Sequence, residues 1–131
     1  MNQMVEEGLG VLINKIDVGI YIIKNYEIEF ANEQFLKMVG YPLKELLGKE
    51  CVSLAAQDEK NRLQKIKTEH ARMGTYPRMI EFWIVTKEGD RKFIRNRYHL
   101  IKEEEGVDFR LTVNDTKNTE HVYRGILSGI R

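Results

Sequence analysis

The stretch Val18-Gly19-Ile20-Tyr21-Ile22-Ile23 has the composition and length of a buried strand, and it decides how the rest of the chain is interpreted. Lys24-Asn25-Tyr26 follows as a turn and residues 27–31 as a second strand, so the pattern predicts an antiparallel hairpin. Asn32 suits the N-cap of a helix, and Gly40 stands where a C-terminal glycine ends one. The core of the fold should therefore begin with a hairpin that leads directly into a short helix.

Further helices and then three strands are predicted beyond this helix. Pro42 opens a short helix that ends at Gly48, and a longer one begins near Asp58 and ends at Gly74. Apolar and polar residues then alternate over residues 79–86, 91–101 and 109–113, with turns at 87–90 and 103–106. This order of elements predicts an α+β fold.

An amphipathic helix is expected ahead of the first strand, in residues 1–17. Its apolar stripe, with spacings of 4, 3 and 4 residues, holds Val5, Leu9, Leu12 and Ile16. A single domain should follow over residues 18–117, and residues 118–131 should form a linker or a signalling helix.

The composition indicates one cytoplasmic globular domain. The chain has 131 residues, of which 42% are hydrophobic and 31% charged, enough for one core and too few for two domains. The 21 Lys and Arg residues are balanced by 20 Asp and Glu residues with both signs interspersed, so no nucleic-acid partner is expected. No secretory signal is recognisable and no uncharged run approaches the ~20 residues of a membrane helix, so direct membrane contact is not expected either.

Motifs for catalysis and metal binding are missing from the sequence. It contains no Gly-rich phosphate loop, no Gly-x-Ser-x-Gly elbow and no His-Glu-x-x-His pattern. Cys51 is the single cysteine, which excludes an internal disulfide, and with three histidines it cannot supply a Cys-rich zinc site. We therefore expect neither an enzyme nor a metal site, and the sequence indicates no cofactor.

Four linked motifs resemble, in order, the opening half of a PAS domain; they lie at residues 18–23, 28–32, 38–41 and 45–49. The likeness continues with Thr86-Lys87-Glu88-Gly89 between two strands and with Asp115-Thr116-Lys117 after the last, where Thr116 replaces the family's usual isoleucine. It covers residues 18–117 and implies a five-stranded antiparallel sheet of order 2-1-5-4-3, with short helices enclosing a small cavity over one face. It also implies a non-catalytic sensory module of a larger signalling protein, such as a two-component sensor kinase or a cyclase.

Strand parity and the helical stripes predict which side chains line this cavity. The predicted set is Ile28, Phe30, Phe35, Met38, Leu63, Ile66, Ile80, Phe82, Asn96, Tyr98, Leu111 and Val113. Asn96 and Tyr98 are its expected polar contacts, and such a mostly apolar cavity suits a small neutral or weakly acidic organic molecule. The alternative is a protein-interaction module whose core is filled by side chains and takes no ligand.

Cys51 and His70 raise cofactor hypotheses that their surroundings weaken. The segment from Gly48 to Ala55 places Cys51 as in the flavin-binding light sensors of the PAS family, but it shares only the glycine, cysteine and leucine of their motif. His70 lies on the apolar face of the long helix, as does a haem-ligating histidine in some relatives, yet it stands one turn before Gly74 instead of three. A small buried cysteine and a capping or core histidine are the simpler interpretations.

Association and output are assigned to the two ends of the domain. Trp83 falls on the sheet face opposite Phe82 and Ile84, where an indole is either covered by the N-terminal helix or a second subunit or is an ordinary surface-packed aromatic. We expect a homodimer whose interface holds Val5, Leu9, Leu12, Ile16 and Trp83. Asp115, which follows the last strand, is the expected coupling point to an output domain of the parent protein.

Overall fold

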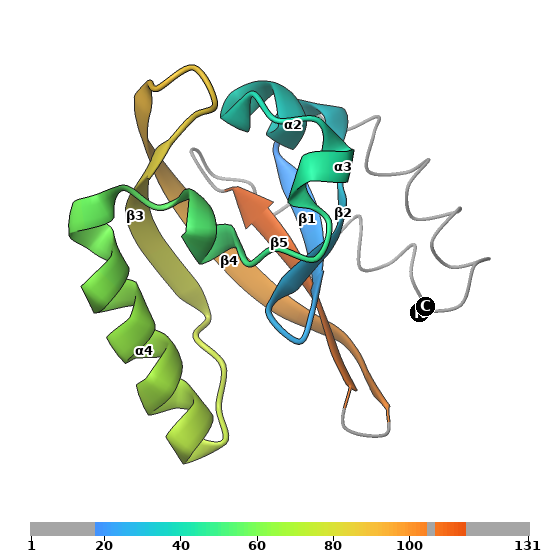
Figure 1. Cartoon of the computed structure of the whole chain (residues 1–131). Helices are drawn as coiled ribbons and strands as arrows, with labels where there is room; N and C mark the ends of the chain where they lie inside the picture. Colours follow the sequence, from blue (N-terminus) through green and yellow to red (C-terminus); the bar gives the residue numbers. More distant parts are fainter. Residues whose placement is uncertain (1–17, 105–106, 115–131) are drawn as a thin grey trace.

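The described structure is organised around one sheet. The computed structural model describes residues 18–104 and 107–114, in which five antiparallel strands have the order β2-β1-β5-β4-β3 (Figure 1). This is the order that the family resemblance implies, and the α+β fold class is confirmed. The predicted N-terminal helix and C-terminal segment lie outside the described residues, and with them Val5, Leu9, Leu12, Ile16 and Asp115.

The strands are β1 (Ile20–Lys24), β2 (Glu27–Ala31), β3 (Met79–Val85), β4 (Arg91–Glu104) and β5 (Val107–Asn114). β1 and β2 form the predicted hairpin, and its turn residues Asn25 and Tyr26 have positive φ angles of 48° and 75°. β4 runs past its predicted end at residue 101, because its pairing with β5 continues until Glu104 lies opposite Val107.

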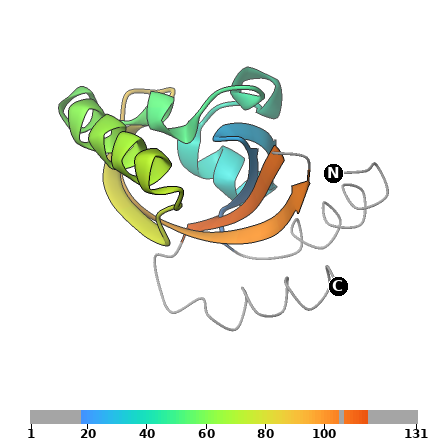
Figure 2. The same ribbon diagram turned by 90° about the horizontal axis from the view of Figure 1, so that it is seen from below.

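The helical elements are α2 (Glu33–Val39), α3 (Leu43–Leu46), the 3-10 turns η1 (Cys51–Leu54) and η2 (Gln57–Glu59), and α4 (Lys60–Met73). Figure 2 shows α2, α3 and α4 on the same side of the curved sheet. Asn32 is the predicted N-cap, since its Oδ1 accepts hydrogen bonds from the backbone N–H groups of Phe35 and Ile20, both at 2.9 Å. The same side chain therefore starts α2 and joins it to β1.

Strand pairing defines the two faces of the sheet, because directly opposed residues of antiparallel strands point to the same side. Thr112 lies opposite both Tyr21 and Tyr98, and this helix-covered side is called the inner face. Leu111 lies opposite Ile22, and the side that they share is called the outer face. The main hydrophobic core, which includes Tyr21 and Phe35, lies between the inner face and the helices.

Both edges of the sheet are bonded to the segments that surround the core. At the β3 edge, the N–H of Ala56 donates to the carbonyl of Trp83 at 2.8 Å, and the N–H of Trp83 donates to the Glu59 carboxylate at 2.8 Å. At the β2 edge, the N–H of Ile28 donates to the carbonyl of Lys49 at 2.8 Å. These bonds hold η1, η2 and the start of α4 against the sheet, and they occupy backbone groups through which an edge strand could pair with another chain.

In the part of the chain that the structure describes, no helix is long and apolar enough to span a membrane. The same residues contain no group of three or more His, Cys, Asp or Glu side chains placed to hold a metal ion.

Candidate functional site

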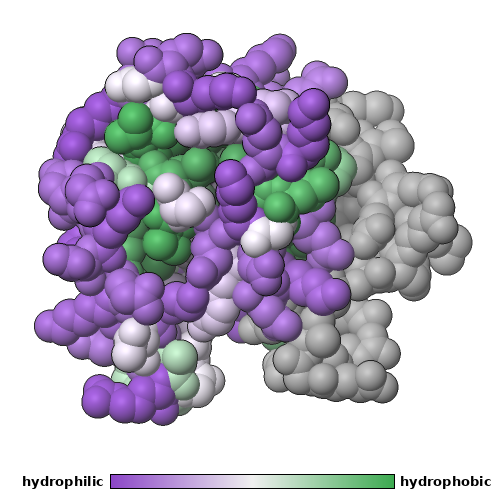
Figure 3. Space-filling model, in the orientation of Figure 1, coloured by the Kyte–Doolittle hydropathy of each residue, from purple (hydrophilic) through white to green (hydrophobic). Residues whose placement is uncertain are grey.

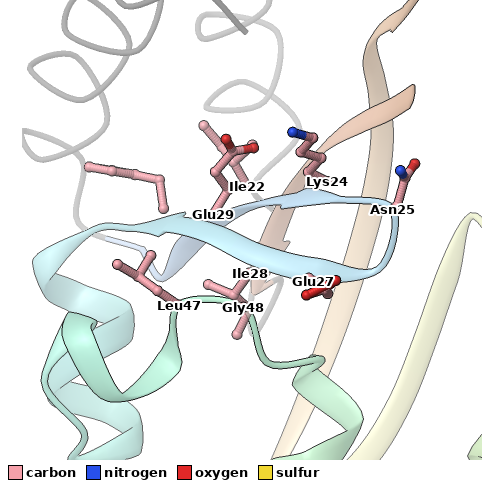
Figure 4. Close-up of a pocket in the computed structure, with 9 residues that line it drawn as sticks. Ile22, Lys24, Asn25, Glu27, Ile28, Glu29, Leu47 and Gly48 are labelled. Atoms are coloured by element: carbon pink, nitrogen blue, oxygen red, sulfur yellow. The ribbon is translucent and has the colours of Figure 1, made fainter. Parts of the chain in front are cut away.

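Two hollows are the candidates for a ligand site. The larger is a groove of about 550 Å³ beside the β1–β2 hairpin, where Lys24 and Glu29 project from the strands and Leu47 approaches from the end of α3 (Figure 4). The smaller is an inner cavity of about 50 Å³ between the sheet, η1 and α4. Hydrophobic residues gather in two places on the helical side of the molecule, each surrounded by hydrophilic side chains (Figure 3).

The inner cavity lies between the sheet and the helices, where the family resemblance implies a cavity. Its deep wall includes Tyr21, Cys51 and Tyr98, and its apolar walls include Leu63 and Phe82. Pockets for organic ligands usually measure roughly 300 to 1,000 Å³. A volume of about 50 Å³ has room for one to a few water molecules or a ligand of similar size.

A buried polar cluster forms the deep end of this cavity; it comprises Tyr21, Cys51, Asn96, Tyr98 and Asn114. The Nδ2 atom of Asn96 lies 2.8 Å from the Tyr21 hydroxyl, 3.4 Å from the Tyr98 hydroxyl and 3.8 Å from the Cys51 Sγ. Asn114 Nδ2 donates to Asn96 Oδ1 and so connects β5 to β4. Asn96 is fully buried, and its amide joins three strands and η1.

Gly19 is required by the position of Asn114. A Cβ atom at residue 19 would lie 2.6 Å from Asn114 Oδ1, closer than side-chain carbons approach other atoms. Among the described residues, neither Asn114 Oδ1 nor the buried Thr112 Oγ1 has a hydrogen-bond partner. The inner face thus carries unused hydrogen-bonding capacity at its centre.

The ionisable members of the polar cluster are neutral at physiological pH. Burial raises the pKa of the Cys51 thiol from about 9 to about 11. Burial also raises the pKa of Tyr21 and of Tyr98 above the ordinary value of tyrosine. The cluster can therefore donate and accept hydrogen bonds, but it offers neither a thiolate nor a charged base.

Four of the twelve predicted lining residues border the inner cavity; they are Leu63, Ile80, Phe82 and Tyr98. Asn96 lies behind it in the polar cluster. Phe35 and Ile28 are buried in the core, and Met38 and Ile66 pack against that core from α2 and α4. Ile28 also borders the edge groove.

Phe30, Leu111 and Val113 cannot line the inner cavity, so this part of the prediction is wrong. Leu111 and Val113 lie opposite Ile22 and Ile20 on the outer face. Phe30 lies opposite Ile22 and points to the same outer face. A register shift after this pair brings Ile28 instead of Glu29 opposite Ile23, so Phe30 and Ile28 point to opposite sides of the sheet. The inward positions of β5 belong to the polar residues Thr112 and Asn114.

The sequence interpretation missed the mouth of the cavity, which is lined by Tyr26, Glu50, Lys67 and Tyr76. The sequence pattern places Tyr26 only in a turn, and it gives Tyr76 no role. Tyrosines in two separate connecting segments are an available signal, but only the fold brings them together: the ring centroids of Tyr26 and Tyr76 lie 5.1 Å apart in a stacked arrangement.

Three further residues that the sequence analysis singled out lie in the described part of the chain. His70 is a capping residue, since its Nδ1 lies 2.8 Å from the Thr75 hydroxyl and its carbonyl accepts from the Thr75 N–H. Cys51 is buried at the start of η1. Trp83 lies on the outer face, 39% exposed, and packs edge to face against Phe93.

A sheet of order 2-1-5-4-3, with helices over one face and a small cavity beneath them, defines a class of small α+β domains. A family model described as PAS domain matches residues 17–118, and the chain belongs to the PAS domain family. No curated protein sequence matches the chain significantly.

Solved structures share this fold at low sequence identity. The LOV protein of Rhodobacter sphaeroides superposes with a TM-score of 0.76 at 18% identity, over 99% of this chain and 83% of that protein. A PAS domain from a two-component sensor histidine kinase gives 0.64 at 11% identity, over 86% and 96%. The N-terminal domain of a diguanylate cyclase with a PAS/PAC sensor from Marinobacter aquaeolei gives 0.61 at 14%, over 79% and 98%.

Proposed function

We propose that this chain is a non-catalytic, cytoplasmic sensory module of a larger signalling protein, and that a molecule of only a few non-hydrogen atoms occupies its inner cavity. Membership of the PAS family supports the signalling role. The similar domains from a sensor histidine kinase and a diguanylate cyclase are examples of the proteins that carry such modules. The observation that carries the proposal is the cavity of about 50 Å³ backed by the polar cluster.

The polar cluster supplies a route from the cavity to the end of the sheet. A ligand that bonds to the hydroxyl of Tyr21 or Tyr98 competes for bonds that these groups share with Asn96. Asn96 is in turn bonded to Asn114, the last residue of β5. Asp115 follows it directly, so ligand binding would shift the population of arrangements at the proposed coupling point.

Titration of the whole chain with small alcohols, followed by NMR, tests this proposal. We expect saturable shifts at Tyr21, Cys51 and Tyr98. Leu63→Trp should abolish these shifts, because it places a large ring in the cavity wall. Leu47→Trp is the matched control, since Leu47 is 46% exposed in the edge groove, and it should leave them unchanged. Shifts that survive Leu63→Trp would contradict the proposal.

A protein-interaction module with a filled core is the second candidate. The fully buried Tyr21, Phe35 and Asn96 occupy much of the space between helices and sheet, which favours this alternative. Native mass spectrometry of the purified chain separates the two: a retained mass beyond the protein supports a ligand module. The mass of the protein alone, together with no NMR shift on titration with any small molecule, supports a filled core.

A flavin does not fit the residues present. Its three fused rings exceed a cavity of about 50 Å³, and Glu50 and Val52 flank Cys51 where the light sensors have an asparagine and an arginine. We expect the purified chain to be colourless and to gain no blue absorption when it is refolded with flavin mononucleotide.

Dimerisation and output complete the proposed function. We place the homodimer interface at Val5, Leu9, Leu12, Ile16 and Trp83, and the coupling to an output domain at Asp115. Charged residues in place of Leu9 and Leu12 should raise the monomer fraction in sedimentation without unfolding the domain. Asp115→Ala in the full-length parent should uncouple output from ligand occupancy while ligand affinity stays within a few-fold.

A further inference from the structure

The mouth of the inner cavity is built from three tyrosine rings that come from separate parts of the chain. Tyr26 and Tyr76 stack with their centroids 5.1 Å apart, and the Tyr76 and Tyr98 rings meet edge to face at 5.3 Å. Tyr26 lies in the β1–β2 turn, Tyr76 precedes β3 and Tyr98 lies in β4. All three line the cavity, so a continuous aromatic wall leads from the surface to the polar cluster.

Cations already contact this wall at two points. The Lys67 Nζ lies 4.7 Å from the Tyr26 centroid and forms an ion pair with Glu50 across the mouth. The Arg110 guanidinium lies 4.1 Å from the Tyr76 centroid. A ring face attracts a cation within ~6 Å, and aromatic side chains beside a carboxylate recognise ammonium groups. Glu50 and Lys67 both line the cavity, so their ion pair belongs to the site itself.

We infer that this mouth is an aromatic cage for a small alkylammonium ligand, whose position the ammonium group of Lys67 occupies in the structure. The inference deepens the proposed function, since it names the ligand class of the same cavity. Glu50 supplies the counter-charge, and the hydroxyls of Tyr98 and Tyr21 can accept N–H bonds from the deeper side. A cavity of about 50 Å³, enlarged by withdrawal of the Lys67 side chain, suits an amine of a few non-hydrogen atoms.

Lys67 sets the affinity because it competes from within the chain. A tethered group acts at an effective concentration on the order of millimolar or above, so a free amine must displace it. The side chain of Lys67 is 28% exposed and can swing into solvent. Lys67→Met removes the competing charge and keeps an unbranched apolar stem.

The experiment compares ethylammonium with ethanol, which has the same number of non-hydrogen atoms and no charge. Titrations followed by NMR at Tyr26, Tyr76 and Tyr98 use the full chain and its Lys67→Met variant. We expect Lys67→Met to bind ethylammonium about tenfold more tightly than the parent protein, with little change for ethanol. Adding Glu50→Gln should reverse most of that gain, and Tyr26→Leu should reduce it.

Unchanged circular dichroism is the control for folding of each variant. Lys65→Met is the matched control for charge removal on α4, since Lys65 is exposed and does not line the cavity, and it should leave ethylammonium binding unchanged. Equal binding of ethylammonium and ethanol to Lys67→Met would overturn the inference and leave the proposed ligand cavity intact. Failure of both probes to shift any cavity residue would overturn the proposed function as well. A capped lysine that binds Lys67→Met more tightly than ethylammonium would assign the cage to a partner's lysine and overturn the free-amine assignment.

Discussion

The two halves of the sheet use their outer faces differently. In the β1–β5 half, the outward residues Ile20, Ile22, Leu111 and Val113 are at most 2% exposed. In the β3–β4 half, the outward aromatic pair of Trp83 and Phe93 is 39% and 46% exposed. Apolar side chains on the same face of one sheet are therefore buried in one half and exposed in the other. The apolar character of a residue in a strand does not by itself show to which face its side chain points.

The inner face shows the complementary difference. β3 sends the apolar residues Phe82 and Ile84 toward the helices, as alternation predicts. β5 sends Thr112 and Asn114 inward instead and keeps its apolar residues outward. A central strand buried on both sides can carry its polar residues on the helix-covered face, provided that partners such as Asn96 bind them.

The largest expected effect tests whether the outer face of the β1–β5 half is core. Leu111→Ala should lower the free energy of unfolding by about 2 to 5 kcal/mol, because it truncates a fully buried side chain. Phe93→Ala is the control on the other half, and it should cost about 1 kcal/mol or less because the ring is nearly half exposed. Urea unfolding measures both, and equal losses would show that the two halves do not differ.

The second effect tests the bonding of the polar cluster. Asn96→Leu should cost about 1 to 3 kcal/mol, because it leaves the buried Asn114 amide and Tyr21 hydroxyl without their partner. The double variant Asn96→Leu with Asn114→Leu should lose less stability than the sum of the losses in the two single variants, since Asn114→Leu removes an amide that Asn96→Leu leaves without a partner. Additive losses in urea unfolding would contradict a direct bond between the two amides.

These differences also show what the sequence can predict. The hairpin turn, the Asn32 cap and the glycine ends of α2 and α4 were predictable, since each depends on residues close in the chain. The face of Leu111 and Val113 was not, because alternation gives two sets of positions and only the pairing with β1 decides which set points inward. The cage was missed for a related reason: Tyr26, Tyr76 and Tyr98 are distant in sequence and meet only through the sheet order.

A third, smaller effect follows from the burial of Cys51. Since its pKa is raised from about 9 to about 11, the folded protein holds the thiol proton more tightly than the unfolded chain. Its contribution to stability is complete below about pH 9 and is lost as the pH rises toward about 11, at up to ~1.4 kcal/mol per pH unit. Just above pH 9, before tyrosines titrate, the free energy of unfolding of Cys51→Ala should fall less steeply with rising pH than that of the parent protein. An identical slope in the variant would show that the thiol does not cause the loss.

The smallest effect concerns Thr112, whose inward hydroxyl has no partner among the described residues. Thr112→Val keeps the shape of the side chain and removes a buried polar atom, so the free energy of unfolding should stay constant or rise by up to about 1 kcal/mol. The same change at Asn114 would not be neutral, because Asn114 bonds to Asn96. If instead Thr112→Val lowered stability by more than about 1 kcal/mol in urea unfolding, the hydroxyl would have a hydrogen-bond partner, and Asn114 Oδ1 would be the one unpaired polar atom left on the inner face of β5 among the described residues.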